Sequence, residues 1–411
     1  MATENNNKNL NVPNLRFPEF SGEWTKTTLG KIGNTFNGLT GKSGADFGQG
    51  SPYITYKSIF DSSRIDLSRV EFVTITDQER QKETQNKVQF GDIFFTTSSE
   101  TPEEVGMTSV LLDDIEDCYL NSFCFGYRLF AKDKTLPEYM RFYLRNQAIR
   151  KKLFVLAQGS TRFNISKGEV MNVSVSLPEI DEQKKIAKLL SLLEKRIDTQ
   201  IKIIEDLKIL KSAISKQIFV QKPICWNRLD TLFSKGKAGG TPTSTNKDYY
   251  NGDIPFLSIN DITKQGKYIR YTENHLSQSG LDNSSAWIVP AHSLIMSMYA
   301  SVGLVTINEV PIATSQAMFA MQLKDKGLLD YLYYYLSYFK NRHIHKYLET
   351  GTQSNINADI VRSIMVPDYG HGRNIEIAST LQSIDAKIDN ELSVLEQFNK
   401  QKNYLSSQMF I

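Results

Sequence analysis

The chain repeats its own order of residues, and this internal repeat limits the possible folds more than any single motif does. Each match is short, but the matches keep the same order across nearly the whole chain. The matched pairs are Trp24 with Trp226, residues 52–59 with 255–262, residues 90–93 with 290–294, Val105-Gly106 with Val302-Gly303, residues 136–144 with 328–336, and Gly159-Ser160 with Gly351-Thr352. The repeat predicts two similar globular units.

Each copy is followed by a long segment without proline or glycine, residues 182–219 and 374–411. Both segments are rich in Leu, Ile, Lys, Glu and Gln, which favour helix. A heptad pattern fits both, and the apolar seam comprises Leu190, Leu193, Ile197, Ile204, Leu207 and Ile214 in the first segment and Leu381, Ile384, Ile388, Leu395, Phe398 and Leu405 in the second.

Polar residues interrupt the seam in the same slots of both helices. Gln200 corresponds to Glu391, and Lys211 corresponds to Lys402. Such interruptions commonly fix the register and the partner of a coiled coil. Because a globular unit separates the two helices, the chain must double back for them to pair, which makes the pair antiparallel. The alternative is two unrelated surface helices, each docked on its own domain.

The predicted fold class is α/β, with two similar α/β domains separated by two long helices that form an antiparallel coiled coil, a pseudo-two-fold repeat. The expected ranges are 1–23 for a lead-in, 24–180 and 223–370 for the domains, and 181–222 and 371–411 for the helices. Within the first domain we expect strands at 53–56, 93–96, 125–130 and 173–177, and a helix at 136–156.

Composition leaves the function open. The formal net charge is only +3, which permits a nucleic-acid partner without requiring one. Cys118, Cys124 and Cys225 lack the spacing of a zinc site or a disulfide framework and indicate reduced thiols. Residues 1–11 are polar, and no apolar run is long enough to span a membrane, so we expect a cytoplasmic protein without membrane contact.

Several ordered phrases resemble the specificity subunit of type I restriction-modification enzymes. They are Phe17-Pro18-Glu19-Phe20 before Gly22-Glu23-Trp24, Lys237-Ala238-Gly239-Gly240-Thr241-Pro242, Gln158-Gly159-Ser160 and Thr350-Gly351-Thr352 before Asn164-Ile165 and Asn355-Ile356, and Leu177-Pro178 before residues 181–187. The second copy departs from this pattern, since Arg373-Asn374 replaces Glu182-Gln183.

This resemblance implies that each domain is a target-recognition domain that reads one half of a bipartite site in double-stranded DNA. It also implies that the helices set the spacer and dock two modification subunits, which methylate adenine, and that restriction subunits join to cleave DNA with ATP. No cofactor is then expected on this chain itself. S-adenosylmethionine, ATP and Mg²⁺ are expected on the partner subunits.

The candidate DNA contacts lie in loops rich in Gly, Ser, Thr, Asn and basic residues, which also dominate ordinary surface turns. Arg162 is the strongest single candidate, because a guanidinium can bridge O6 and N7 of guanine. The full set is Lys42, Ser43, Thr97, Ser99, Thr161, Arg162 and Asn164 in the first copy, and Lys237, Thr241, Tyr299, Ser301, Gln353, Ser354 and Asn355 in the second.

The sequence contains no complete catalytic or metal-binding motif. Thr40-Gly41-Lys42-Ser43 lacks the first glycine of a phosphate-binding loop, since Phe36 stands there. His343 and His345 are two residues apart, which is unsuited to metal ligation from one helix. No Asn- or Asp-Pro-Pro-Tyr/Phe motif is present, so adenine methylation is not assigned to this chain and we expect a non-catalytic protein.

Two other classes of function compete with DNA specificity. A stand-alone methyltransferase or fused restriction enzyme is disfavoured by the missing motifs. A non-catalytic coiled-coil scaffold that joins two protein partners without reading bases fits the composition equally well, and the family resemblance is what separates it from a DNA reader.

Overall fold

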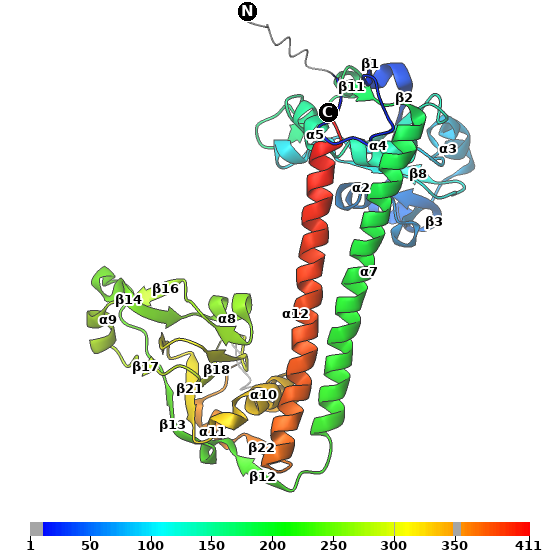
Figure 1. Cartoon of the computed structure of the whole chain (residues 1–411). Coiled ribbons are helices and arrows are strands. Elements are labelled where there is room, and N and C mark those ends of the chain that lie inside the picture. The colour runs from blue at the N-terminus through cyan, green and yellow to red at the C-terminus, as the bar shows by residue number, and fades with distance from the viewer. Residues whose placement is uncertain (1–10, 300, 348–354) are drawn as a thin grey trace, which may run out of the picture. The chain divides into compact units, whose positions relative to one another are not determined.

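The computed structural model describes residues 11–299, 301–347 and 355–411, which form two compact units. The first unit contains residues up to 200 together with 394–411, and the second contains residues 201–393. Each unit therefore combines one globular domain with stretches of both long helices (Figure 1).

The first unit is built on two sheets. The larger has the order β2 (Gly33–Asn37), β9 (Cys124–Leu129), β5 (Ile93–Thr96) and β7 (Thr108–Val110), with antiparallel neighbours throughout. The smaller has the order β4 (Glu71–Val73), β3 (Phe47–Ile54) and β8 (Tyr119–Leu120). Two short ribbons pair β1 (Thr25–Thr28) with β11 (Ser174–Leu177) and β6 (Ser98–Ser99) with β10 (Phe163–Asn164).

The second unit repeats this plan with added strands. Its larger sheet has the order β13 (Phe233–Ala238), β21 (Met318–Leu323), β18 (Leu294–Ser297), β19 (Val305–Asn308) and β15 (Tyr268–Ile269). Its smaller sheet has the order β16 (Asn274–Leu276), β14 (Tyr250–Leu257), β20 (Ile312–Thr314) and β17 (Ile288–Val289), and a ribbon pairs β12 (Cys225–Arg228) with β22 (Met365–Asp368).

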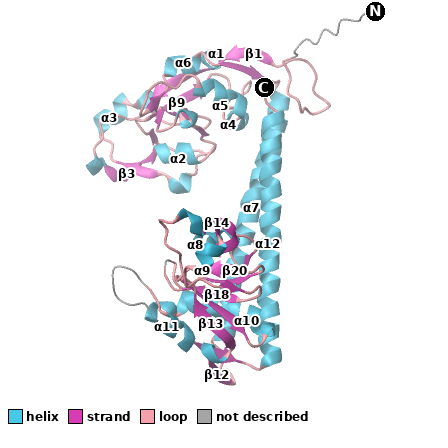
Figure 2. Cartoon of the chain, turned by 90° about the vertical axis from the view of Figure 1, so that its left-hand side faces the viewer, coloured by secondary structure: helices cyan, strands magenta, loops and turns pink. Residues whose placement is uncertain are grey.

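Short helices surround these sheets (Figure 2). In the first unit they are α1 (Leu29–Ile32), α2 (Tyr56–Asp61), α3 (Asp77–Lys82), α4 (Pro137–Tyr143), α5 (Gln147–Phe154) and α6 (Lys167–Met171). In the second they are α8 (Ile259–Gln265), α9 (Gln278–Asp282), α10 (Leu329–Arg342) and α11 (Ala358–Ser363). The tyrosines and leucines of α10 share one apolar core with β18, β19 and β21, which explains the aromatic run in that part of the sequence.

The two long helices are α7 (Ile180–Phe219) and α12 (His371–Gln408). Within the first unit the beginning of α7 lies with the end of α12, and within the second unit the end of α7 lies with the beginning of α12. The pairing is therefore antiparallel, and the predicted fold of two α/β domains with a coiled coil is confirmed. Each apolar residue of the predicted seam is buried or half-buried.

The polar lysines of the seam make the same kind of ion pair in each unit. In the first unit the ammonium of Lys402 lies 2.7 Å from a carboxylate oxygen of Glu194, which also binds the buried Arg141 of α4. In the second unit Lys211 pairs with Asp385, whose other oxygen accepts a hydrogen bond from Tyr334 of α10 at 2.8 Å. Each lysine thus links the two helices, and each acid ties them to the neighbouring domain.

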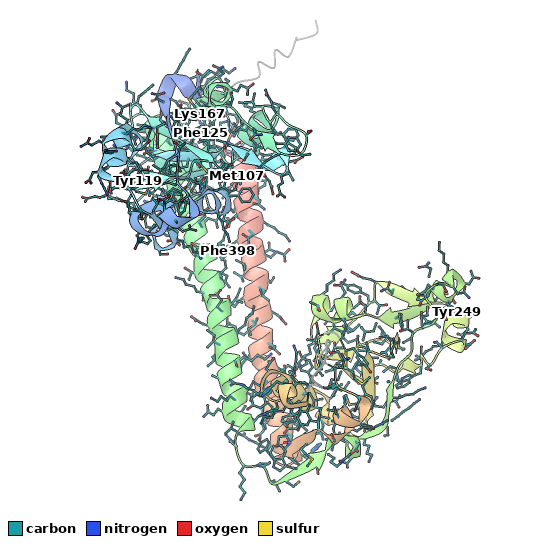
Figure 3. The ribbon with its side chains drawn as sticks, turned by 180° about the vertical axis from the view of Figure 1, so that it is seen from behind. Met107, Tyr119, Phe125, Lys167, Tyr249 and Phe398 are labelled. Carbon is teal, nitrogen blue, oxygen red and sulfur yellow. The ribbon has the colours of Figure 1, made fainter. Side chains whose placement is uncertain are left out.

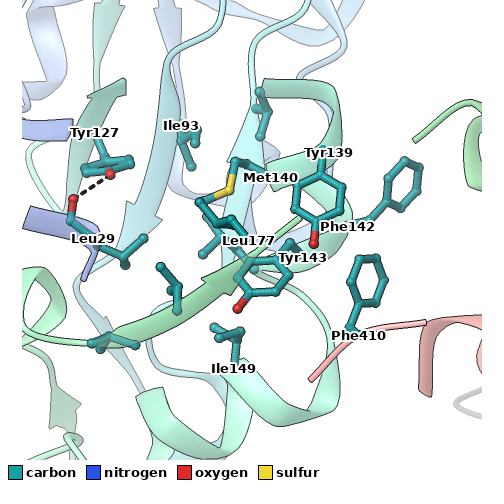
Figure 4. Packing of buried hydrophobic residues seen from close by; sticks show 14 of the residues in the cluster. Leu29, Ile93, Tyr127, Tyr139, Met140, Phe142, Tyr143, Ile149, Leu177 and Phe410 are labelled. Carbon is teal, nitrogen blue, oxygen red and sulfur yellow. Dashed lines mark hydrogen bonds between the residues drawn. The ribbon is translucent and has the colours of Figure 1, made fainter. Parts of the chain in front are cut away.

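A buried phenylalanine packs against tyrosine rings of the domain in each unit, and we call this contact the aromatic lock. In the first unit Phe410, just beyond α12, lies 5.7 Å from the ring of Tyr139 and 5.8 Å from the ring of Tyr143, centroid to centroid (Figure 4). In the second unit Phe219, the last residue of α7, lies 5.4 Å from the ring of Tyr335. Both phenylalanines are buried, so each core is completed by the end of a long helix.

The altered junction in the second copy has a local explanation. In the first copy Glu182 is buried and held by Arg16 of the lead-in segment, at 2.8 and 2.7 Å from its guanidinium. Arg373, its counterpart, lies at the surface. Asn374 and Gln183 are both buried. The amide of Asn374 bonds Asp368 and the backbone of Tyr369, whereas that of Gln183 bonds the backbone of Leu136, Lys134 and Pro178.

Three local predictions were wrong. The strand expected at 53–56 ends at Ile54, because the hydroxyl of Thr55 caps α2. The helix expected at 136–156 is two helices, because Asn146 caps α5 with its side chain. Trp24 precedes β1 and is buried, whereas Trp226 lies within β12 and is half exposed, so the two tryptophans are not structural equivalents.

No helix among the described residues is long and apolar enough to cross a membrane.

We expect Phe410→Ala to lower the free energy of unfolding of the first unit by about 3–5 kcal/mol, the usual cost of truncating a buried phenylalanine. Hydrogen exchange at the amides of α4 during denaturant titration measures the loss. Tyr404→Ala is the matched control, because this ring on α12 is 60% exposed. Equal losses for the two variants would contradict the aromatic lock.

Candidate nucleic-acid interface

One edge of the larger sheet in the first unit gathers most of the predicted contact loops. At this edge β2 ends at Asn37, β5 ends at Thr96, β7 begins at Thr108 and β9 begins at Cys124. The antiparallel register brings these four points together, since Asn37 is level with Phe125 and Thr96 with Cys124. We call the loops at this edge the loop edge of the first unit. The equivalent loops of the second unit lie where β13 ends at Ala238, β18 ends at Ser297, β19 begins at Val305 and β21 begins at Met318, and we call them the loop edge of the second unit.

A small hairpin projects the predicted residues Thr161 and Arg162 from the loop edge. Gln158 and Asn164 exchange backbone hydrogen bonds of 2.9 and 2.8 Å across its neck. Gly159 has φ +137°, and a Cβ there would lie 2.1 Å from the carbonyl oxygen of Arg162. The tight neck therefore requires glycine, and it leaves both residues exposed at the tip.

The Asn-Ile phrase that follows the hairpin anchors it to the strand edge. The amide of Ile165 donates to the carbonyl of Thr97 at 2.9 Å, and the side chain of Ile165 is buried in the core. The second unit has the same bond, from the amide of Ile356 to the carbonyl of Met298 at 3.1 Å. The repeated Asn-Ile phrase therefore fixes the following isoleucine to the loop after the central strand in both units.

A second bond ties the loop after each central strand to a neighbouring turn. In the first unit the amide of Thr97 donates to the carbonyl of Phe123 at 3.0 Å, and in the second the amide of Met298 donates to the carbonyl of Ala317 at 2.7 Å. Both loop edges are therefore held by the same pair of backbone bonds, although their side chains differ.

The Gly-Gly-Thr-Pro phrase packs the loop after β13 against β20 of the smaller sheet. The amide of Gly240 donates to the carbonyl of Thr314 at 2.9 Å, and a Cβ on Gly239 would lie only 1.8 Å from that carbonyl oxygen. Gly38 makes the same close approach to Asn121 in the first unit, at 2.0 Å. A side chain at either glycine would push the loop off the sheet.

Two basic residues near the first loop edge were not predicted from the sequence. Arg150 of α5 donates to the carbonyls of Glu103, Val105 and Gly106, and burial lowers its pKa to about 10. Lys167 lies near the ring of Phe125 (Figure 3), and burial lowers the pKa of its ammonium. Arg150 braces the loop, and Lys167 adds positive charge beside it.

Some predicted contact residues of the first unit have side chains that are bonded to other protein groups, and others have exposed side chains. The ammonium of Lys42 bonds the carboxylate of Glu79 at 2.7 Å, and the amide and hydroxyl of Ser43 donate to the carboxylate of Asp46 at 2.7 and 2.9 Å. The hydroxyl of Thr97 donates to the carbonyl of Phe123 at 2.7 Å, and that of Ser99 to Glu104 at 3.0 Å. Thr161, Arg162 and Asn164 are exposed at the loop edge, whereas Thr97 is half-buried. The side-chain amide of Asn164 donates to the carbonyl of Arg162 at 3.3 Å.

The predicted residues of the second unit line the equivalent edge. Lys237 lies on β13, and Thr241 follows that strand and bonds the amide oxygen of Gln316. Tyr299 and Ser301 follow β18 and are exposed. Gln353 and Ser354 lie outside the described residues, while Asn355 is half-buried beside the Ile356 anchor.

Sequence reasoning missed Arg150, Lys167, Phe123 and Gln316 at these edges. Their residue types are ordinary for the elements that carry them, and only the pairing of distant strands brings them to the loops. No local signal marked them.

The described residues hold no group of three or more His, Cys, Asp or Glu side chains placed to bind a metal ion. A groove of about 1110 Å³ in the first unit is lined by acids and bases together, including Asp61, Arg64, Glu138, Arg141 and Lys402. Arg64 pairs with Asp113, and Arg141 and Lys402 pair with Glu194. Three basic groups of the groove are therefore paired with carboxylates, and a fourth, Arg145, donates to the backbone carbonyls of Thr108 and Ser62.

The two α/β domains, with the same strand order and the same backbone bonds at their loop edges, define a protein with a duplicated domain. The family model described as "Type I restriction modification DNA specificity domain" matches residues 21–208 and again residues 225–399. The chain therefore belongs to the type I restriction-modification DNA specificity family and carries two copies of its domain.

Similar proteins match part or nearly all of this chain. The putative type I restriction enzyme MjaX specificity subunit of Methanocaldococcus jannaschii is 24% identical over 416 residues, covering 96% of this chain and 94% of that protein. The MjaIX specificity subunit of the same organism is 26% identical over 158 residues, so the match spans 37% of this chain and 36% of that protein. The crystal structure of the S subunit from M. genitalium superposes with a TM-score of 0.58 at 13% identity, covering 97% of this chain and 99% of that one.

We expect Gly239→Ala to destabilise the second unit by about 1–3 kcal/mol, because its new methyl group overlaps a backbone carbonyl that cannot rotate away. Chemical unfolding followed by hydrogen exchange of the β21 amides measures this loss. Gly372→Ala is the control, since it lies in α12 with open space around it and should stabilise the helix by up to about 1 kcal/mol. A neutral Gly239→Ala variant would contradict the close approach.

Proposed function

We propose that this chain is the DNA sequence-specificity subunit of a type I restriction-modification complex, and that each domain reads one half of a bipartite site. The observation that carries the proposal is the duplicated loop edge. The two edges share their backbone anchors at Ile165 and Ile356 but present different side chains. A constant scaffold with variable loops suits the reading of two different half-sites.

The chemistry of the loop edges fits base reading together with phosphate contact. Hydroxyl, amide and guanidinium groups such as those of Thr161, Arg162 and Asn164 match the donors and acceptors at base edges in the major groove. Lys167 and Lys237 supply positive charge for phosphates, which add affinity and position the protein without reading sequence. The small net charge of +3 is compatible with basic side chains gathered at the loop edges.

In this proposal the chain is not itself catalytic. Methylation of adenine with S-adenosylmethionine belongs to two modification subunits, and ATP-dependent cleavage with Mg²⁺ belongs to restriction subunits. The chain's own contribution is to place these partners on the correct sequence.

The outer faces of the long helices supply surfaces for the modification subunits. In the first unit Leu192 is half exposed on α7, and in the second Ile209 and Leu210 are exposed on α7 and Leu392 on α12. Ile209 and Leu210 are neighbours in sequence, and we propose that such exposed apolar side chains on the helices contact the modification subunits. The coiled coil would then set the spacer between half-sites and also hold the methylating partners.

We expect cells that carry this chain with its modification subunit to methylate adenine in a split motif, and cells that lack only this chain to lose that methylation. Methylome sequencing of the two strains measures the difference. A strain with an active modification subunit and no split motif would rule out the proposal. The purified chain alone should show no methylation of the same DNA.

Replacing residues 24–176 with the first domain of another family member should change one half of the methylated motif only. The second domain keeps its own loop edge, so the other half-site and its base sequence should persist. The methylome of the hybrid strain reads out both halves at once. If both halves changed, one domain could not be the reader of one half.

A further inference from the structure

Phe123 presents an exposed aromatic ring at the loop edge of the first unit. The residue lies between β8 and β9, in the turn from Asn121 to Cys124, and is 60% exposed. A single exposed apolar side chain is common on protein surfaces and needs no partner. Phe123 differs from such residues because hydrogen bonds hold its backbone beside the predicted contact loops.

The turn that bears Phe123 is braced on both sides. Its amide donates to the side-chain oxygen of Asn121 at 2.7 Å, and its carbonyl accepts from the amide and the hydroxyl of Thr97 at 3.0 and 2.7 Å. On the other side the backbone of Gly38 lies so close that a Cβ would be 2.0 Å from the carbonyl oxygen of Asn121. The ring therefore projects from a fixed backbone, which reduces the entropy lost when it binds a partner.

The backbone of Phe123 is bonded to the loops that carry the predicted base readers. Thr97 bonds Phe123 directly and also accepts the anchor bond from Ile165, which follows Asn164. Ser98 pairs with Asn164 across the β6–β10 ribbon. A duplex that reaches Thr97 or Asn164 will thus meet the ring of Phe123 in the same group of loops.

The second unit has an exposed ring at the same edge, supplied by a different loop. Ala317 takes the place of Phe123, since its carbonyl accepts the bond from Met298. The residue after Met298 is Tyr299, which is 39% exposed. Both edges thus carry an aromatic ring beside the same backbone bond, although the sequences around the rings differ.

We propose that Phe123 contacts the apolar surface of a base within the first half-site, and that Tyr299 does so in the second. This inference rests on the proposed DNA-reading function and names a contact within it. A phenyl ring has no hydrogen-bonding group, so it can recognise only the face of a base or the 5-methyl group of thymine. Contact with the 5-methyl group would distinguish thymine from the other bases, whereas stacking on the face of a base would add affinity with little dependence on which base it is.

The test uses the complex of this chain with its modification subunits and a duplex that contains its methylated motif. We expect Phe123→Ala to weaken specific binding by about 5- to 100-fold, the range that corresponds to losing one aromatic contact with a base. Binding to a duplex with a shuffled motif should not change. Fluorescence anisotropy at fixed salt measures both affinities.

Phe130→Ala is the matched control, because Phe130 follows the opposite end of the same strand β9 and is 67% exposed. Its affinity for the motif should equal that of the wild type. Tyr299→Ala and Tyr271→Ala form the corresponding pair in the second unit, where Tyr271 is 60% exposed. Thermal unfolding of all four variants should match the wild type, since each removes an exposed ring.

Two further experiments distinguish contact with a thymine methyl group from stacking on the face of a base. Replacing each thymine of the first half-site by deoxyuridine removes the methyl group, and one such duplex should abolish the effect of Phe123→Ala if the ring contacts a methyl. If the ring stacks on a base, 2-aminopurine at that step should lose fluorescence with the wild type but not with Phe123→Ala.

The outcomes distinguish this inference from the function on which it rests. If the wild-type complex binds its motif and Phe123→Ala behaves like Phe130→Ala, the base contact is wrong while the specificity role stands. If the wild-type complex shows no preference for any bipartite duplex, the proposed function itself fails and the inference falls with it.

Discussion

Each domain packs against the long helices through one phenylalanine. This phenylalanine lies at or just beyond the end of a long helix and contacts two tyrosines of the domain. Phe410 meets Tyr139 and Tyr143, and Phe219 meets Tyr331 and Tyr335, at the same positions of two copies of one design. Burial of these rings supplies apolar contact that the short helices α4 and α10 could not gain from their own domains alone. The ion pairs at Lys402 and Lys211 then fix which turn of the helices faces each domain.

Much of this architecture could be predicted from the sequence because its signals are periodic or repeated. The heptad seam, with its polar slots at Lys211 and Lys402, predicted a self-paired antiparallel coiled coil. The order of matched segments predicted two similar domains, and the sheets of the two units do share their strand order. Errors arose where a side-chain cap outweighed a run of apolar residues, as at Thr55 and Asn146.

The candidate site was less predictable, because it is made by strand pairing between distant residues. Arg162 and Thr161 lie at an exposed hairpin tip, as expected for contact residues. Lys42 resembles them in sequence, yet its ammonium is held by Glu79, an ion pair that no local pattern announces. Phe123 looks like any core phenylalanine until the register of β5 and β9 places it at the open end of the sheet.

The division of the chain into units has a consequence for how the protein is made. The second unit is a continuous stretch, residues 201–393, whereas the first also needs residues 394–411. During synthesis the domain that leaves the ribosome first must therefore wait for the segment that follows the second domain before Phe410 can fill its core. Until then Tyr139 and Tyr143 lack that ring, so the nascent first domain should depend on chaperones or on slow, late closure more than the second domain does.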